Sequence, residues 1–312
     1  MTQPQAENTV RIVEVGPRDG LQNEAGRVPT SDKTDLVRTL IATGLPEIEL
    51  TSFVSPKWIP QLGDAAELLD MLAGDLPEGI VFSALVPNMQ GMERLLEANE
   101  KAMKAVGRRA IDKVCLFTAA SETFSKKNTN ATIEESLERF GPVAEAAREH
   151  GLQLRGYVSC AFACPFEGPV AIDSVVCVAE SLARDLLVDE LSIADTIGHA
   201  TPGDVSDRMG RLSTIETTMN LHLHDTFGRA ADCVRAGLRA GVRSFDGSIG
   251  GLGGCPYASA PGKRAPGNIA TSTLVQVVED EGFSTGVDHA KLSMARQLAD
   301  DLVARARAGA PA

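Results

Sequence analysis

Short apolar runs rich in β-branched residues alternate along the chain with longer segments whose apolar residues recur at helical spacing. The runs predict strands, because a strand buried on both faces stays apolar over about four to eight residues. The predicted strands are Arg11–Val15, Glu47–Leu50, Ile80–Leu85, Lys113–Phe117, Gln153–Val158, Glu190–Ile193, Met219–His224 and Val242–Asp246. They are spread over most of the chain.

The segments between these runs carry helix signals. One helix is predicted to begin at Thr30 or at the serine after it, because either residue can cap a helix, and to end at Gly44. Thr132 and Glu135 have the spacing of a capping box, so a second helix begins there and ends before Gly151. Strands and helices therefore alternate along the chain.

This alternation, repeated over roughly 250 residues, predicts an α/β fold of the (β/α)8 or TIM-barrel type. We expect a single domain over residues 1–312, with the barrel at roughly 10–285 and an extra C-terminal helical segment at roughly 288–308. A doubly wound open sheet is the alternative. No GxGxxG motif follows the first strand, which removes the best support for a dinucleotide-binding sheet.

Composition excludes several classes of partner. The net charge of −12 argues against a nucleic-acid partner, because phosphate binding needs a concentrated basic surface. No apolar run approaches the roughly 18–20 residues that cross a bilayer, so we expect no membrane partner. The N-terminal residues lack a signal or transit pattern, and the six cysteines are scattered, as is typical of reduced thiols. These features predict a cytoplasmic protein.

Titratable residues stand near the carboxyl ends of several predicted strands, where a barrel of this type carries its chemistry. They are Arg18 and Asp19 after the first strand, Glu49 in the second, Arg155 in the fifth, Asp195 after the sixth, and His222 and His224 in the seventh. A buried structural ion pair would explain any one of Glu49, Arg155 and Asp195 equally well. Their joint placement is what indicates an active site.

The His222-Leu223-His224 stretch is the most informative part of this ring. Residues two apart in a strand point to the same face, which in a barrel can be the interior. Two imidazoles there make half of a metal site, and Asp19 adds an anionic oxygen. Such a set suits Mg²⁺, Mn²⁺ or Zn²⁺. The alternative is a pair of surface histidines at the frayed end of a strand.

Arg18 raises a second hypothesis. Gly16 and Pro17 precede it and Gly20 follows Asp19, so the backbone there takes a tight path. A guanidinium fixed beside a metal ligand can stabilise an oxyanion. The alternative is a solvated surface turn.

The stretch from Gly250 to Asn268, GGLGGCPYASAPGKRAPGN, is rich in glycine and proline and holds Cys255 near its start. Few of its residues can pack a core. Composition leaves two interpretations, a surface linker or a mobile loop after the eighth strand that carries chemistry. Roles for Cys255 and Asn268, which a family resemblance implies, favour a lid that brings both residues to the site.

The chain resembles the 3-hydroxy-3-methylglutaryl-CoA lyase family over roughly Val10 to Leu298. The resemblance rests on motifs that fall in the family's order and near its spacing: VEVGPRDGLQNE, ELTSFVSPKWIPQLGDAAE, SETFSKKN, RGYVSCAFACPFEG, LHLHDTFGRA and GGLGGCPYA. The GPRDG and HxHDT motifs are also similar to those of isopropylmalate synthases. The SPKW and GGCPYA motifs are more specific to the lyases.

The resemblance implies roles for individual residues. The metal ligands it implies are Asp19, His222, His224 and Asn268, and the metal is Mg²⁺ or Mn²⁺. It also implies that Cys255 is the active-site cysteine, Arg18 the oxyanion arginine, Glu49 and Asp195 acidic residues important for activity, Arg155 a substrate-binding or structural arginine, and Glu14 a support for the first loop.

The implied reaction is cleavage of 3-hydroxy-3-methylglutaryl-CoA to acetoacetate and acetyl-CoA. Asp195 is our candidate for the base that removes the hydroxyl proton, and Cys255 for the donor that protonates the enolate carbon. These two acid–base roles could also be exchanged. Arg18 would stabilise the thioester oxygen as negative charge develops on it. The implied partners are a CoA ester and further copies of the chain, in a dimer or a larger homo-oligomer.

The chain departs from the family pattern between Cys255 and Asn268, where it has roughly three or four extra residues, including Lys263 and Arg264. We predict that these two bind CoA phosphates; the alternative is a solvated basic turn. The acidic pair after the NxAT segment is also missing, since this chain reads NIATSTL. A lyase for a larger branched 3-hydroxyglutaryl-CoA is therefore the main rival hypothesis, and a condensing synthase of the isopropylmalate synthase type is the next.

Overall fold

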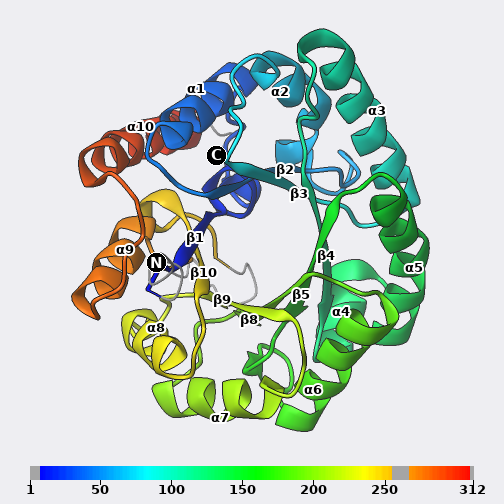
Figure 1. Ribbon diagram of the computed structural model, residues 1–312, viewed down its shortest axis with the longest axis vertical. Coiled ribbons are helices and arrows are strands. Elements are labelled where there is room, and N and C mark those ends of the chain that lie inside the picture. The colour runs from blue at the N-terminus through cyan, green and yellow to red at the C-terminus, as the bar shows by residue number, and fades with distance from the viewer. Residues whose placement is uncertain (1–7, 255–266, 310–312) are drawn as a thin grey trace, which may run out of the picture.

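The computed structural model describes residues 8–254 and 267–309. Parallel strands close into a barrel, seen nearly end-on in Figure 1, in the order β1-β10-β9-β8-β5-β4-β3-β2. The barrel strands are β1 Arg11–Glu14, β2 Glu47–Ser52, β3 Val81–Leu85, β4 Lys113–Ala119, β5 Gln153–Ser159, β8 Glu190–Asp195, β9 Thr218–Leu223 and β10 Ser244–Gly247. The predicted TIM barrel is confirmed, and each strand overlaps its predicted run.

Helices surround the barrel (Figure 1). They are α1 Thr30–Ile41, α2 Ala65–Leu72, α3 Met89–Val106, α4 Glu122–Thr129, α5 Ile133–Glu149, α6 Ile172–Glu180, α7 Pro202–Leu212, α8 Ala230–Arg239, α9 Thr271–Asp280 and α10 His289–Ala308. The predicted capping box is present at the start of α5, where Thr132 and Glu135 cap each other. The C-terminal helix α10 packs beside α1, which closes the outer ring.

Shorter elements lie mainly in the loops. They are the helical turns η1 Gly16–Gly20, η2 Pro60–Leu62, η3 Ser181–Asp185 and η4 Ile249–Gly251, and the two-stranded hairpin β6 Ala163–Cys164 with β7 Gly168–Pro169. The hairpin and α4 carry no clear periodicity in the sequence, and we did not predict them. Among the described residues, no helix combines the length and apolar character that a membrane span needs.

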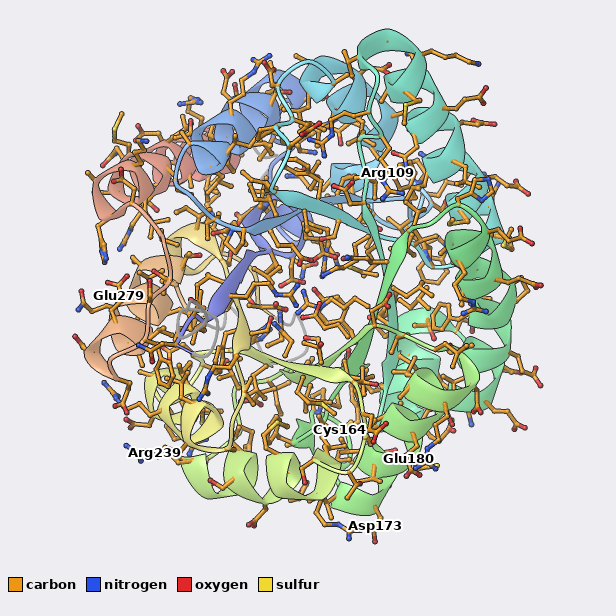
Figure 2. The ribbon with its side chains drawn as sticks, viewed as in Figure 1. Arg109, Cys164, Asp173, Glu180, Arg239 and Glu279 are labelled. Carbon is orange, nitrogen blue, oxygen red and sulfur yellow. The ribbon has the colours of Figure 1, made fainter. Side chains whose placement is uncertain are left out.

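The two faces of the barrel strands differ in chemistry. Alternate residues such as Ile48, Phe82, Leu191 and Leu221 point outward and pack under the helices in one large apolar core. Figure 2 shows charged side chains such as Asp173 and Arg239 on the far side of those helices, pointing away from the barrel. The outward strand residues therefore hold the helices in place.

The inward residues are largely polar and charged. At the floor, the ammonium of Lys113 lies 2.6 Å from a Glu47 oxygen and 2.9 Å from a Glu190 oxygen, and Arg11 pairs with both carboxylates. Higher up, Arg155 reaches across the barrel from β5. The interior is therefore built from ion pairs below and from the candidate site above.

Candidate active site

A cavity of about 360 Å³ opens among the loops at the carboxyl ends of the strands. Its polar lining includes Arg18, Asp19, His222 and His224, and an apolar wall includes Phe117. Cavities at this end of a barrel are where such folds carry their chemistry. The structure therefore brings together four of the residues that the sequence predicted for the site.

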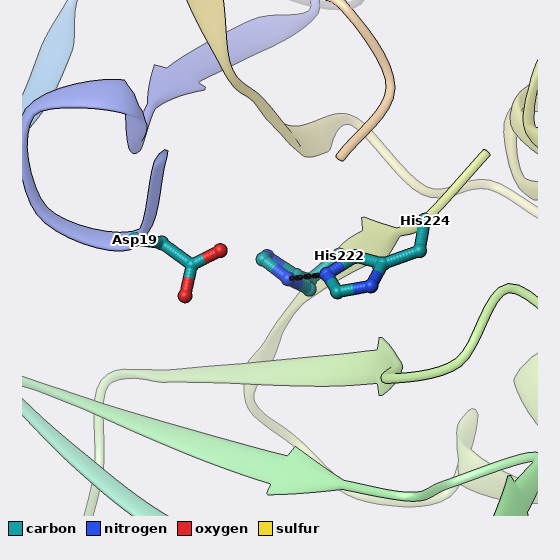
Figure 3. A group of neighbouring side chains, drawn as sticks. All are labelled: Asp19, His222 and His224. Atoms are coloured by element: carbon teal, nitrogen blue, oxygen red, sulfur yellow. Dashed lines mark hydrogen bonds between the residues drawn. The ribbon is translucent and has the colours of Figure 1, made fainter. Parts of the chain in front are cut away.

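Asp19, His222 and His224 form a compact cluster (Figure 3). One ligand atom from each lies within 4.8 Å of the others, and the two histidine Nε2 atoms are 3.2 Å apart. Both histidines are almost completely buried, so the hypothesis of surface histidines at a frayed strand end is wrong. Their two-residue spacing near the end of β9 places both rings inside the barrel mouth.

Asn268 joins this cluster from the segment that follows the loop. Its amide nitrogen donates to Asp19 Oδ2 at 2.7 Å and to the carbonyl of Leu252 at 3.0 Å. Its Oδ1 atom is buried and has no hydrogen-bond partner among the described residues. Gly253 permits this approach, because a Cβ there would lie 2.6 Å from the Asn268 amide nitrogen.

The donor set fits a divalent cation. Burial raises the pKa of Asp19, but the charges of Arg18 and the two histidines outweigh it, so the pKa falls to about 2. Burial and His222 lower the pKa of His224 to about 4. Near neutral pH the carboxylate is therefore ionised and His224 is neutral, which are the protonation states that metal ligands need. Two imidazoles with carboxylate and amide oxygens suit Mg²⁺, Mn²⁺ or Zn²⁺.

The helical turn η1 presents Arg18 and Asp19. Its glycines are required by close packing: a Cβ on Gly16 would lie 2.6 Å from Glu14 Oε1, and one on Gly20 would lie 2.7 Å from Ser248 Oγ. Glu14 accepts hydrogen bonds from the backbone N–H of Gly16 and Ile249. The structure thus confirms that Glu14 supports the first loop, and the tight backbone path predicted for this segment has a steric cause.

Arg18 is held on two sides. One of its terminal nitrogens lies 2.8 Å from Asp19 Oδ1 and the other lies 2.6 Å from Glu49 Oε2. The guanidinium also lies 5.5 Å from the centre of the Tyr157 ring. Burial lowers the pKa of Arg18, but Glu49 and Asp19 raise it well above its usual value. The group is therefore a fixed cation at the cavity, not part of a solvated turn.

Glu49 does not line the cavity. It is completely buried, and its Oε2 accepts hydrogen bonds from Arg18 and from the Tyr157 hydroxyl. We predicted that Glu49 is catalytic. In the structure it orients Arg18, which makes it a positioning residue.

Arg155 is a correction to the prediction of substrate binding. Its side chain is completely buried below the cavity, where it pairs with Asp246 at 2.5 Å and stacks on the Tyr157 ring at 4.7 Å. The residue points into the barrel from β5 and is not among the residues that line the cavity. Arg155 is therefore structural, which was the alternative that the sequence left open.

Asp195 also lies elsewhere than we expected. Its neighbours Ala194 and Thr196 line the cavity, so Asp195 points to the opposite, helix-facing side of β8. Its two oxygens accept the backbone N–H groups of His199 and Ala200, at 2.8 and 2.9 Å. Burial raises its pKa to about 6 despite these bonds. This geometry assigns Asp195 to the turn after β8 and gives no support to a role as base.

Three predicted site residues, Cys255, Lys263 and Arg264, lie outside the described residues, and so does most of the predicted lid. Gly254 is the last described residue before Cys255, and it lines the cavity. The side-chain amide of Asn23 donates to the carbonyl of Gly254 at 3.2 Å.

Sequence reasoning missed Asp246 and Tyr157. Asp246 bonds His222 Nδ1 through its Oδ2 at 3.0 Å, and the ring of Tyr157 stands edge-on to the His222 ring at 5.9 Å. Burial raises the pKa of Asp246, but Arg155 and His222 lower it below its usual value. An acidic residue at the end of an apolar run was the available signal. The strand register that pairs Asp246 with His222 is not visible in the sequence.

The chain is similar to known proteins over most of its length. Residues 9–299 match the family model described as HMGL-like. The chain is 45% identical over 285 residues to the mitochondrial hydroxymethylglutaryl-CoA lyase of Arabidopsis thaliana, covering 91% of this chain but 57% of that protein. It is 42% identical over 293 residues to the 3-hydroxy-3-isohexenylglutaryl-CoA/hydroxymethylglutaryl-CoA lyase of Pseudomonas aeruginosa, covering 93% of this chain and 91% of that protein.

The chain is also similar to solved structures of HMG-CoA lyases. The HMG-CoA lyase of Brucella melitensis is similar with a TM-score of 0.87 and 43% identity, over 95% of this chain and 99% of that one. An HMG-CoA lyase of Acinetobacter baumannii, solved in complex with coenzyme A and 3-methylmalate, is similar with a TM-score of 0.85 and 35% identity, over 97% of this chain and 93% of that one.

Proposed function

The chain belongs to the HMGL-like family, and from this premise we propose that it is a divalent-metal-dependent carbon–carbon lyase that cleaves 3-hydroxy-3-methylglutaryl-CoA to acetoacetate and acetyl-CoA. One observation carries the proposal: the Asp19, His222 and His224 cluster and the fixed Arg18 guanidinium line the same cavity. These are the two devices that the reaction needs, a site for a Lewis acid and a cation for an enolate.

Asp19, His222 and His224 would hold the cation, with Asn268 as a fourth ligand through its buried Oδ1. When bound, Mg²⁺ or Mn²⁺ supplies a Lewis acid that acidifies the tertiary hydroxyl and orients the free carboxylate of the substrate. The amide nitrogen of Asn268 fixes the orientation of Asp19 through their hydrogen bond.

Arg18 acts on the other half of the substrate. Cleavage leaves the enolate of acetyl-CoA, whose negative charge develops on the thioester oxygen. A guanidinium already held by Glu49 and Asp19 stabilises that charge without having to reorganise during the reaction. Cys255 can account for the proton at both ends of the reaction. As a thiolate it would take the proton of the tertiary hydroxyl while the carbon–carbon bond breaks, and as a thiol it would return that proton to the enolate carbon. A thiol with a pKa near about 8.5 can give and regain a proton near neutrality.

Product analysis tests the proposal. Purified protein with Mg²⁺ or Mn²⁺ should convert 3-hydroxy-3-methylglutaryl-CoA to equal amounts of acetoacetate and acetyl-CoA. Cys255→Ala should abolish turnover while Mn²⁺ binding survives. Absence of both products from the metal-loaded wild-type protein, with and without a thiol reductant, would refute the activity. A condensing synthase would instead consume acetyl-CoA in the presence of a 2-oxo acid.

A larger branched acyl group is the second candidate substrate. Part of the cavity wall is apolar and is formed by Leu85, Phe117, Phe124 and Phe140. An alkenyl chain would pack against these side chains more favourably than water does. The Pseudomonas aeruginosa relative carries both substrates in its name. A kcat/KM for 3-hydroxy-3-isohexenylglutaryl-CoA above that for 3-hydroxy-3-methylglutaryl-CoA would assign the chain to the longer substrate.

We further propose that Lys263 and Arg264 bind the phosphates of CoA, although the whole chain carries a net charge of −12. The double change to alanine should raise the KM for the CoA ester and leave kcat nearly unchanged. Arg211→Ala is a matched control, because Arg211 is exposed and pairs with Asp173 away from the cavity. An unchanged KM in the double variant would exclude this role.

We also propose a homo-oligomer, a dimer or larger, which light scattering after size-exclusion chromatography tests directly. A single species at the 32.9 kDa mass of one chain would contradict it. The cytoplasmic location stays a prediction.

A further inference from the structure

Asp246 contacts His222, one of the two histidines in the candidate metal site formed by Asp19, His222 and His224. It is the β10 residue in register with His222 on β9, so both side chains enter the barrel interior at the same height. Asp246 Oδ2 lies 3.0 Å from His222 Nδ1, while His222 Nε2 faces His224. The two ring nitrogens of His222 therefore have different partners.

Arg155 fixes the other oxygen of Asp246. Its terminal nitrogen donates to Asp246 Oδ1 at 2.5 Å, and its guanidinium is held over the Tyr157 ring. Both side chains are almost completely buried, so water does not compete for either. A carboxylate paired with arginine in this way only accepts hydrogen bonds. The nitrogen of His222 that faces it must then carry a proton.

We infer that Asp246 is a positioning residue that holds His222 in its Nδ1–H tautomer and so leaves the Nε2 lone pair free to bind the cation. The inference rests on the metal centre of the proposed function. A histidine ligand commonly owes its tautomer and ring orientation to such a carboxylate on its other nitrogen. Among the described residues, no carboxylate bonds a ring nitrogen of His224 as Asp246 bonds His222. Asp246 therefore sets the tautomer of only one histidine of the pair.

Asp246→Asn tests this with little change in size. Its amide oxygen will face Arg155, because the opposite orientation would place an NH₂ group against the guanidinium. The NH₂ group then donates to His222 Nδ1, which moves the ring proton to Nε2 and blocks the metal-binding nitrogen. We expect Mn²⁺ affinity to fall by about 10–100-fold.

Ser192→Ala is the matched control. Ser192 is also completely buried in the barrel interior, and its hydroxyl donates to Asn220 Oδ1 at 2.8 Å. Its loss removes a buried hydrogen bond without touching His222. This variant should bind Mn²⁺ as the wild-type protein does, even where its melting temperature falls as far as that of Asp246→Asn.

Two measurements test the inference. Electron paramagnetic resonance measures Mn²⁺ affinity, and the imidazole ¹⁵N shifts of the metal-free protein report the tautomer of His222. The chain has five histidines, so His222 can be assigned with single variants. We expect Nδ1–H in the wild-type protein and Nε2–H in Asp246→Asn. Wild-type affinity in a folded Asp246→Asn, or an Nε2–H tautomer in the wild-type protein, would overturn the inference. Should the variant not fold, the wild-type spectrum alone decides. A wild-type protein that binds no Mn²⁺ would instead refute the metal centre itself.

Discussion

At the scale of single residues, Arg18 owes its fixed position to two carboxylates and the face of one aromatic ring. We predict that Arg18→Gln lowers kcat by about 10²–10³-fold and changes KM much less, because the guanidinium acts on charge that exists mainly in the transition state. Steady-state kinetics on the CoA ester measures this.

Arg211→Gln provides the control for this prediction, since it removes an exposed arginine on α7 and should leave kcat unchanged. An Arg18→Gln enzyme with kcat within about threefold of wild type would show that the enolate is stabilised by another group.

The sequence predicted that Asp19, His222 and His224 lie together, but not the orientation of every neighbour. The spacing of His222 and His224 put both on one face of a strand, and the structure shows that this face enters the barrel mouth. Asp195 and Arg155 depended on which face of each strand enters the barrel and at what height. That is decided by packing against the helices, where Leu191 and Ile193 share the outward face with Asp195. A sequence without register could not supply it.

At the scale of elements, Glu14 joins three segments of the chain. It accepts hydrogen bonds from Gly16 in η1, from Ile249 in η4 and from the Thr271 hydroxyl at the start of α9. Burial outweighs these bonds and raises its pKa from 4.5 to about 7. The loops on both sides of the Asp19, His222 and His224 cluster are therefore tied to one carboxyl group.

This pKa predicts a pH dependence. Because the folded pKa lies above the unfolded one, Glu14 contributes stability that is fully present below about pH 4.5 and is lost as the pH rises through about 7. The contribution is about 3 kcal/mol. Glu14→Gln should therefore lose less stability than wild type between pH 5 and pH 8 in urea unfolding.

Asp195, whose pKa is also raised, titrates in both proteins, so the difference between them isolates Glu14. Parallel stability curves for Glu14→Gln and wild type would exclude titration of Glu14 in this range.

Gly253 sets how closely the backbone approaches the cluster of Asp19, His222 and His224. Its φ is +107°, and a Cβ there would lie 2.6 Å from the Asn268 amide and 3.2 Å from Asp19 Oδ2. We predict that Gly253→Ala weakens Mn²⁺ binding, because Asn268 and Asp19 must move apart. Calorimetric titration with Mn²⁺ measures the effect.

Gly241→Ala separates backbone strain from this steric effect. Gly241 has a φ of +91° with open space around its would-be Cβ, so the change should cost about 1–3 kcal/mol of stability and leave Mn²⁺ affinity unchanged. Equal losses of affinity in both variants would contradict the steric explanation.

At the scale of the whole molecule, the barrel strands point apolar side chains outward to the helices and enclose charged side chains in the barrel interior. Lys113 bonds both Glu47 and Glu190 at the centre of the barrel floor and is nearly inaccessible to solvent. We predict that Lys113→Met lowers the free energy of unfolding by about 3–5 kcal/mol, because it leaves buried carboxylates with too few positive partners. Urea unfolding measures this.

Lys101→Met removes a lysine that pairs with Asp70 on the surface, and it should cost less than about 1 kcal/mol. Similar losses in the two variants would mean that the interior charges are well solvated.

The fold was predictable at this scale because strand and helix periods alternate clearly along the chain. The β6–β7 hairpin and α4 were not, because two-residue strands and an eight-residue polar helix depend on their neighbours more than on their own pattern. The charged barrel floor was also missed. Glu47, Lys113 and Glu190 begin three separate runs, and only barrel closure brings them together.

One titration tests the central claim, that a single cation held by Asp19, His222 and His224 is required for cleavage. Protein stripped of metal is given increasing Mn²⁺, and bound Mn²⁺ and acetoacetate formation are followed on the same samples. We predict that activity rises in proportion to occupancy of one site per chain. His222→Ala should lose both Mn²⁺ binding and acetoacetate formation. Full activity of the stripped protein in excess chelator, or activity that does not follow occupancy, would contradict the account.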